Sequence, residues 1–211
     1  MKLYMIRHGR QCSNLCNVNV ELSHEGHRQA QLTGERLKNY GIQGLYASEL
    51  IRAQQTAAHI SGCLALPVIT AKQIEEIHFG DWTGKSDREL DEIWGDLRRQ
   101  YREGETDVTY PSGESGQSCF KRYEEGMNWI INDAQEKGFS NIAIVTHGIA
   151  MRAFLCGVFG IPFARRGLLS YSLENGSITE LSFEKGKYTL ERFNDYAHLE
   201  PYDELLRKHF K

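Results

Sequence analysis

Short apolar runs alternate along this chain with longer segments in which apolar residues recur every three or four positions. The runs at residues 3–6, 44–47, 67–69 and 141–146 predict buried strands. The segments between them predict helices: one capped by Ser23 with Ala30, Thr33, Gly34 and Leu37 on one face and Gly41 at its end, one after Ser48 with Ala53, Ala57 and Ile60, and one with Phe120, Tyr123, Met127, Ile130, Ile131 and Ala134. This alternation favours an α/β fold with a mostly parallel sheet and helices on both faces.

Two segments depart from the alternation. Residues 177–193 hold Glu184-Lys185-Gly186-Lys187 between two alternating runs, which predicts a terminal β-hairpin. The segment 85–118 opens with a capping box, Ser86 with Glu89, and continues as a polar, glycine-rich stretch after a helical stripe of Leu90, Ile93, Trp94, Leu97 and Tyr101. We interpret 85–118 as a small helical insertion bordering a site, with packing alone as the alternative of equal weight. Residues 1–211 are otherwise expected to form one domain.

Composition limits the classes of function. With 25 Lys and Arg against 28 Asp and Glu, the net charge of −3 argues against nucleic acid as a partner. The apolar run before Arg7 is too short for a signal peptide or a membrane span, so a cytoplasmic protein with no membrane partner is expected. The five scattered cysteines indicate reduced thiols. Cys12 and Cys16 lack a nearby histidine that would complete a metal site, and we interpret them as packing thiols.

Two histidines carry the strongest chemical signal. His8 and His147 each precede a glycine at the end of an apolar run, and the carboxyl ends of parallel strands meet at one edge of a sheet. A helix predicted to begin near Gly148 would turn its free amides and its dipole toward the same place, which favours a bound anion. Arg7 beside His8, and Arg52 near the start of the second helix, add guanidinium groups that suit phosphate oxygens.

These residues belong to a longer ordered set of motifs. The set comprises Arg7-His8-Gly9 with Asn14, Leu22-Ser23 with Gly26 and Gln29-Ala30, Ser48-Glu49-Leu50 with Arg52-Ala53 and Gln55-Thr56-Ala57, Glu76 with Phe79-Gly80, Pro111 with Gly113-Glu114-Ser115, Thr146-His147-Gly148, and Asn194-Asp195 with His198-Leu199. In this order, from Lys2 to about Leu199, the sequence resembles the histidine phosphatase superfamily, also called phosphoglycerate mutase-like. The resemblance implies a three-layer α/β/α sandwich, in agreement with the pattern above.

The resemblance also implies roles. His8 would be the nucleophile, and Glu76 the general acid and base, with Glu75 as its rival by sequence alone. Arg7, Arg52 and His147 would hold the phosphoryl group, helped by Asn14, and the Gly148 amide would add a further donor. The implied reaction is metal-independent and cofactor-free hydrolysis of a small phosphorylated metabolite through phosphohistidine. Where the family usually has an acidic residue or Gln and then Thr or Ser, this chain has Arg10 and Gln11, which leaves substrate preference open.

The chemistry explains why these residue types are needed. A phosphoryl group in transfer spreads negative charge over its oxygens, so catalysis depends on alignment and preorganised positive charge. Nearby cations also keep the attacking imidazole unprotonated. Arg10 could bind a second anionic group of the substrate, although a solvated side chain is favoured. Lys85, Arg98, Arg99 and Arg102 are assigned more firmly to the solvated face of a helix.

Three alternatives remain at this stage. A cofactor-dependent phosphoglycerate mutase would return the phosphoryl group to a hydroxyl, although such relatives carry a longer insertion between the acid and the second histidine. His8, His147 and Glu76 could form a two-histidine, one-carboxylate metal site, but Arg7 and Arg52 would repel the cation. A non-catalytic module could bind a phosphorylated partner. Oligomeric state is open, because Trp94 or Phe210 could pack inside the chain or in a homodimer.

Overall fold

A six-stranded sheet runs through the centre of the computed structural model, which describes residues 1–169 and 173–209. Its order is β3-β2-β4-β1-β5-β6. The parallel part contains β1 (Lys2–Arg7), β2 (Gly44–Ser48), β3 (Val68–Ala71) and β4 (Asn141–Thr146). The predicted hairpin closes one edge: β5 (Ile178–Glu184) is antiparallel to β1 and to β6 (Lys187–Asp195). The mostly parallel sheet is therefore confirmed, and Phe210 lies outside the described residues.

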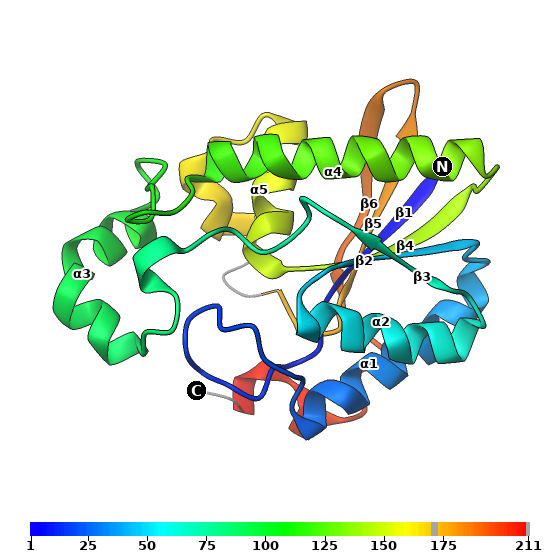
Figure 1. The fold of residues 1–211 in the computed structure, drawn as a ribbon, viewed down its shortest axis with the longest axis horizontal. Coiled ribbons are helices and arrows are strands. Elements are labelled where there is room, and N and C mark those ends of the chain that lie inside the picture. Colours follow the sequence, from blue (N-terminus) through cyan, green and yellow to red (C-terminus); the bar gives the residue numbers. More distant parts are fainter. Residues whose placement is uncertain (170–172, 210–211) are drawn as a thin grey trace.

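Helices cover both faces of this sheet (Figure 1). The helices α1 (His24–Leu37) and α2 (Ile51–Leu64) lie on one face, and α4 (Gly116–Glu136) and α5 (Gly148–Phe159) on the other. Alternate residues of the buried strand β1 enter opposite layers, since Leu3 and Met5 pack toward α4 and α5 whereas Tyr4 and Ile6 pack toward α1 and α2. The three-layer α/β/α sandwich is confirmed.

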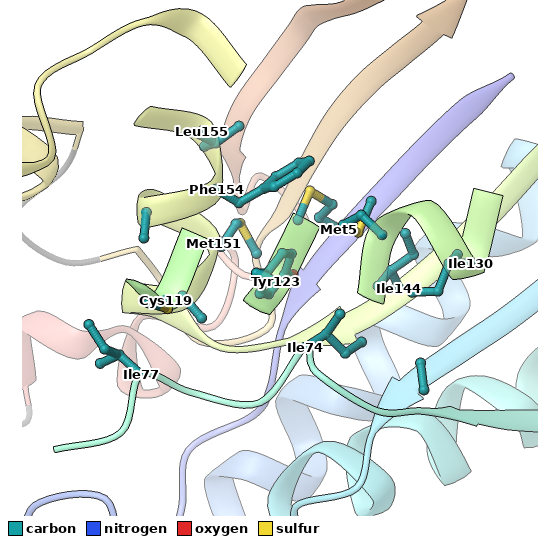
Figure 2. Packing of buried hydrophobic residues seen from close by; sticks show 14 of the residues in the cluster. Met5, Ile74, Ile77, Cys119, Tyr123, Ile130, Ile144, Met151, Phe154 and Leu155 are labelled. Carbon is teal, nitrogen blue, oxygen red and sulfur yellow. The ribbon is translucent and has the colours of Figure 1, made fainter. Parts of the chain in front are cut away.

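The layer between the sheet and α4/α5 holds the larger core. In Figure 2, Tyr123 of α4 and Phe154 of α5 lie close to Met5 of β1, and Ile130 of α4 lies beside Ile144 of β4. The Tyr123 hydroxyl donates to Thr146 Oγ1 (2.9 Å), which in turn donates to the carbonyl oxygen of Ile74 (2.9 Å). This buried chain of hydrogen bonds ties the end of β4 to the segment that precedes Glu76, so the core fixes where the candidate acid lies.

Local signals in the sequence account for the element boundaries. Ser23 caps α1 by accepting from the Gly26 amide (3.2 Å), and Ser86 and Glu89 form the predicted capping box. Lys185 and Gly186, with φ of 49° and 76°, make the two-residue hairpin turn. The third strand was predicted one position too early, because Pro67 has no N–H for the ladder and the strand begins at Val68.

The segment predicted as an insertion forms α3 (Asp87–Glu103) and a loop that leads into α4. Non-helical dihedrals at Trp94 (φ −128°, ψ 32°) kink α3, and the Trp94 ring packs against Trp82 with 6.2 Å between centroids. The amide of Cys16 donates to the carbonyl oxygen of Lys85 (2.9 Å), which joins the loop after β1 to the start of this segment. Figure 1 shows α3 set apart from the sheet, on the side toward which β1 and β4 run.

The chain after β6 returns to α1 and packs there through a small cluster of Leu32, Leu199 and Leu205. Gln29 of α1 donates to the carbonyl oxygen of Leu205 (2.7 Å). His198 Nε2 is hydrogen-bonded to Thr33 Oγ1 (3.1 Å), and burial is the main cause that lowers the pKa of His198 to about 4.

His198 is expected to make stability depend on pH. Below about pH 6.5 the unfolded chain binds a proton on this imidazole that the folded chain does not, so the free energy of unfolding falls between pH 6.5 and 4. We expect His198→Gln to remove about 2 kcal/mol of that fall. Urea denaturation of both proteins at pH 7 and pH 4.5 measures the difference, and an unchanged pH dependence in His198→Gln would contradict it.

No single helix among residues 1–169 and 173–209 has both the length and the apolar composition needed to cross a bilayer. The helix α5 and the 3-10 helix Phe163–Leu169 pass that test only when taken together, and they are bent by 115° relative to each other.

Candidate active site

A cavity of about 300 Å³ opens where β1 ends. It brings together five of the residues predicted from the sequence: Arg7, His8, Asn14, Arg52 and Glu76. The other two lie next to it. His147 is fully buried with its ring centroid 5.1 Å from that of His8, and a Cβ at Gly148 would stand 3.3 Å from Arg7 Nε, so glycine leaves room for the guanidinium.

Hydrogen bonds define which nitrogen of His8 carries the lone pair. Nδ1 lies 2.7 Å from the Gly9 carbonyl oxygen, which can only accept, so Nδ1 carries the proton. Nε2 accepts from Arg52 Nε (3.2 Å). Burial, followed by the positive charges of Arg52 and Arg7, lowers the pKa of His8 well below its usual 6.5. His8 therefore presents an unprotonated Nε2 at neutral pH.

His147 is a second neutral imidazole beside the first. Its Nε2 is 2.8 Å from Ser48 Oγ at the end of β2, and its Nδ1 is a buried atom without a hydrogen-bond partner among the described residues. Burial, and then the charge of Arg52, lowers the pKa of His147 well below 6.5. This residue can therefore offer a hydrogen bond without adding a formal charge.

Two guanidinium groups flank His8. Arg7 Nη1 donates to the carbonyl oxygen of Leu173, while Arg7 Nε is buried without a partner among the described residues. Arg52 is 2 % exposed, and its terminal nitrogens donate to Asn17 Oδ1 (2.7 Å) and to the carbonyl oxygen of Val18 (3.0 Å). Both cations are thus held by the surrounding chain. Arg52 Nε donates to His8 Nε2, and Arg7 lines the same cavity as His8.

Glu75 and Glu76 have different environments. Glu75 pairs with Arg122 (3.1 Å), which also binds Glu114 through two hydrogen bonds of 2.7 and 2.8 Å. Glu76 lines the cavity, and its carboxylate accepts from the amides of Ala150 (2.7 Å) and Ile149 (3.2 Å) at the start of α5. The geometry therefore places Glu76, and not Glu75, beside His8.

The start of α5 differs from the sequence expectation in one respect. We expected its free amides to face a bound anion, but two of them are taken by Glu76. The physical reason is that unpaired N–H groups and the helix dipole attract the nearest negative charge, which is a carboxylate of the chain itself. The helix terminus thus serves to hold the candidate acid.

Sequence reasoning missed four lining residues: Ser13, Asn17, Asn175 and Arg207. Asn17, with a left-handed φ of 44°, accepts from Arg52. Asn175 Nδ2 donates to the carbonyl oxygen of His8 (2.9 Å). Asn17 lies three residues after the motif residue Asn14, whereas Asn175 and Arg207 lie far along the chain and have no local signal.

The interpretation of Cys12 and Cys16 as packing thiols was wrong for Cys12. All five cysteines are free, as expected of reduced thiols, but Cys12 is exposed and does not pack. Cys16 lines the cavity, where burial and then the charge of Glu76 raise the pKa of its thiol to about 12. Because a thiol must ionise to attack, Cys16 does not compete with His8 as a nucleophile near neutral pH.

The geometry does not support the alternative in which His8, His147 and Glu76 bind a metal ion. Among residues 1–169 and 173–209, no three His, Cys, Asp or Glu side chains come together as a possible ligand set. His8 Nε2 accepts from a guanidinium and the Glu76 carboxylate accepts from backbone amides, so the atoms that would bind a cation already have donors as partners. The cavity is therefore arranged for an anion.

Comparison with known proteins agrees with this geometry. The model of the histidine phosphatase superfamily (branch 1) matches residues 3–196. Phosphoglycerate mutase-like protein 4 of Arabidopsis thaliana is 30% identical over 207 residues, which cover 94% of this chain and 87% of the relative. Phosphoserine phosphatase 1 of Hydrogenobacter thermophilus is 25% identical over 205 residues, which cover 94% of each chain.

Solved structures show the same architecture. A mycobacterial glucosyl-3-phosphoglycerate phosphatase in complex with inorganic phosphate has a TM-score of 0.82 at 25% identity, with 93% of this chain and 98% of that chain covered. YhfR of Bacillus stearothermophilus has a TM-score of 0.85 at 23% identity, with 94% and 99% covered. The second likeness concerns the fold alone.

Proposed function

Because the chain belongs to the histidine phosphatase superfamily, we propose that it hydrolyses the phosphomonoester of a small metabolite through a phosphohistidine on His8. The observation that carries this proposal is the state of His8: a neutral ring, its Nδ1 proton bound to the Gly9 carbonyl and its Nε2 lone pair in a cavity with Arg7 and Arg52. A nucleophile needs that lone pair, and its target needs those cations.

In the first step, the Nε2 lone pair of His8 forms the N–P bond while the bond from phosphorus to the ester oxygen breaks. The electron pair leaves with that oxygen, and a protonated Glu76 donates its proton to it, so the product is a neutral alcohol. The hydrogen bond from Arg52 to His8 is replaced by hydrogen bonds from Arg52 to the phosphoryl oxygens. Arg7, His147, Asn14 and the Gly148 amide bind the same oxygens. The negative charge that spreads over these oxygens is thereby balanced.

In the second step, water attacks the phosphohistidine. Glu76, now a carboxylate, accepts the proton of the water as the new P–O bond forms and the N–P bond breaks. The electron pair returns to Nε2, and inorganic phosphate leaves. Each group is then as it was before the ester bound, so no metal or further cofactor is needed for the atoms and charges to balance.

The names of the relatives indicate which class of substrate to test. Phosphoserine phosphatase 1 acts, by its name, on phosphoserine, and the mycobacterial structure holds inorganic phosphate. Both support phosphate-ester hydrolysis here. The name of the Arabidopsis relative leaves mutase chemistry as the alternative, in which the phosphoryl group returns to a second hydroxyl and not to water.

Phosphate release from a panel of metabolite esters tests the function. We expect turnover in the presence of a chelator and without 2,3-bisphosphoglycerate, with values of kcat/KM that rank the esters. Isomerised product that forms only with 2,3-bisphosphoglycerate would establish a mutase, and loss of activity in the chelator would establish metal dependence. Absence of both hydrolysis and isomerisation, with retained phosphate binding, would indicate a binding module.

A further inference from the structure

Glu76 lies in a segment that has no regular secondary structure. Residues 72–79 follow β3 and belong to no helix or strand. Ile74 and Ile77 of this segment are buried in the larger core and lie near α4 in Figure 2. These apolar contacts do not satisfy the backbone carbonyls and amides around Glu76, which need polar partners from other parts of the chain. The position of the candidate acid therefore depends on those partners.

Arg122 of α4 binds the backbone up to and including Glu76. Its Nη1 donates to the carbonyl oxygen of Gln73 (2.9 Å), and its Nη2 donates to that of Glu76 (3.2 Å). The guanidinium also contacts the carbonyl oxygen of Glu75 at 3.4 Å. Because a planar guanidinium presents its N–H groups in fixed directions, bonds to several carbonyls at once restrict the path of the backbone between them.

Glu114 holds Arg122 and binds the backbone on the other side of Glu76. Its carboxylate accepts from Arg122 Nε (2.7 Å) and Nη2 (2.8 Å), and also from the amide of His78 (2.9 Å). The amide of Glu114 donates to the carbonyl oxygen of His78 (2.8 Å). Burial opposes ionisation of this carboxyl, but the hydrogen bonds from Arg122 and from the His78 amide lower the pKa of Glu114 overall. The two charged side chains thus bind the segment before and after the candidate acid.

The sequence motif at residues 111–115 is suited to this contact. A Cβ on Gly113 would overlap with the carbonyl oxygen of His78, so glycine is needed for the close approach of the two segments. Ser115 caps α4, and Arg122 follows about two turns later on that helix. One short motif therefore brings a carboxylate to the segment and begins the helix that carries the guanidinium.

The Glu76 side chain is fixed at both of its ends. Arg122 binds the backbone of Glu76, and the amides of Ile149 and Ala150 bind the carboxylate. An acid can donate its proton only within hydrogen-bond reach of the ester oxygen. A displacement of about 1 Å can lower a reaction rate by about 10²-fold. Contacts with the backbone of Glu76 can therefore affect catalysis from outside the cavity.

We propose that Arg122 and Glu114 are positioning residues, which hold the backbone around Glu76 so that its carboxyl group meets the ester oxygen of the substrate. The inference rests on the proposed function for the role of Glu76 as the acid. Arg122 and Glu114 do not line the cavity that contains His8, so they act through Glu76 and not on the phosphoryl group. Their replacement weakens proton donation and leaves the phosphate-binding side chains in place.

The dependence on the leaving group tests this role. For the ester of a simple alcohol, we expect Arg122→Gln to lower kcat by about 10- to 100-fold. For a nitrophenyl ester, which needs no proton donor, the first step should slow by less than about threefold. Glu114→Gln should show the same contrast, because an amide loses the charge-assisted bonds to Arg122. Inorganic phosphate, titrated by calorimetry, should bind both variants within about twofold of the wild type.

Two control variants separate positioning from a general loss of stability. Lys121→Gln removes an exposed charge one residue away on α4. Ile130→Val shortens a side chain in the buried face of the same helix, which lowers stability without a contact to the segment of Glu76. Both controls should keep the wild-type ratio of rates for the two esters. Equal losses for both esters in Arg122→Gln, or the leaving-group contrast in Ile130→Val, would overturn the inference.

Amide hydrogen exchange tests the placement of Glu76 without turnover. The amide of Ala150 donates to the Glu76 carboxylate, and Glu76→Ala gives its exchange rate when that acceptor is missing. In Arg122→Gln we expect the Ala150 amide to exchange at least about tenfold faster than in the wild type, measured relative to the amide of Ile144 inside the sheet. Unchanged relative exchange of Ala150 in Arg122→Gln would contradict the positioning role.

Failure of the inference and failure of the proposed function give different results. Faster exchange of Ala150 in Arg122→Gln, with no hydrolysis of either ester by the wild type, would overturn the phosphatase and support the placement of Glu76 by Arg122. Hydrolysis by the wild type, with neither the leaving-group contrast nor the faster exchange in Arg122→Gln, would overturn the positioning role and leave the phosphatase intact.

Discussion

Replacement of His8 by Ala is expected to lower kcat for phosphate-ester hydrolysis by on the order of 10⁵-fold, close to the rate left by binding alone. The effect is so large because the imidazole forms the covalent intermediate, and no neighbouring group can take its place. Cys16, the other nucleophilic side chain of the cavity, has a thiol pKa raised to about 12. Phosphate release measured with enzyme at high concentration determines the residual rate.

Rapid quenching with ³²P-labelled ester separates loss of the nucleophile from loss of the fold. Wild-type protein should carry acid-labile label during turnover, and His8→Ala should carry none while still binding inorganic phosphate. His24→Ala provides the matched control, because His24 is exposed on α1 away from the cavity and should leave both readings unchanged. Acid-labile label that persists in His8→Ala would transfer the role of nucleophile to another residue.

Much of this architecture was predictable because its signals are local. Buried strands produce short apolar runs, and the capping residues Ser23 and Ser86 and the turn at Lys185 act within a few positions of themselves. The parallel arrangement then brings residues at strand ends to one edge, which is how Arg7 and His8 could be placed together from the sequence.

The features that were not predictable depend on contacts between distant segments. Arg207 reaches the cavity because its amide donates to Glu174 (3.1 Å) and because Leu205, two positions earlier, is buried against α1. The sequence around Arg207 gives no indication of these partners. The amphipathic pattern correctly places Arg98 and Arg102 in a helix, but Lys85 precedes α3 and is not part of it. The pattern also does not show that another segment lies across from these side chains, and Lys85, Arg98 and Arg102 all line a second cavity of about 450 Å³.

The choice between Glu75 and Glu76 also depends on contacts with distant segments, although the two residues are adjacent in the sequence. Two adjacent carboxylates are equivalent by composition, and only the partners on each side distinguish them. Arg122 of α4 binds Glu75, while the amides at the start of α5 bind Glu76. The functional difference between the two residues is therefore a property of the helices packed against them.

Glu76→Gln is expected to lower kcat by about 10²- to 10⁴-fold for esters of simple alcohols, since an amide cannot donate the proton that the departing alkoxide requires. For a nitrophenyl ester, whose leaving group is stable as an anion, the same substitution should slow the first step far less. Single-turnover kinetics with both esters measure the first step, and the contrast between them is the specific sign of lost general acid catalysis.

Glu75→Gln is the matched comparison for this prediction, because it makes the same change one residue away. Glu75 binds Arg122, and Arg122 keeps both of its hydrogen bonds to Glu114 when Glu75 is replaced. We therefore expect a loss in kcat of less than about tenfold that is equal for both esters. If Glu75→Gln shows the leaving-group contrast and Glu76→Gln does not, the proton donor is Glu75, and the carboxylate at the start of α5 then serves only to cap the helix.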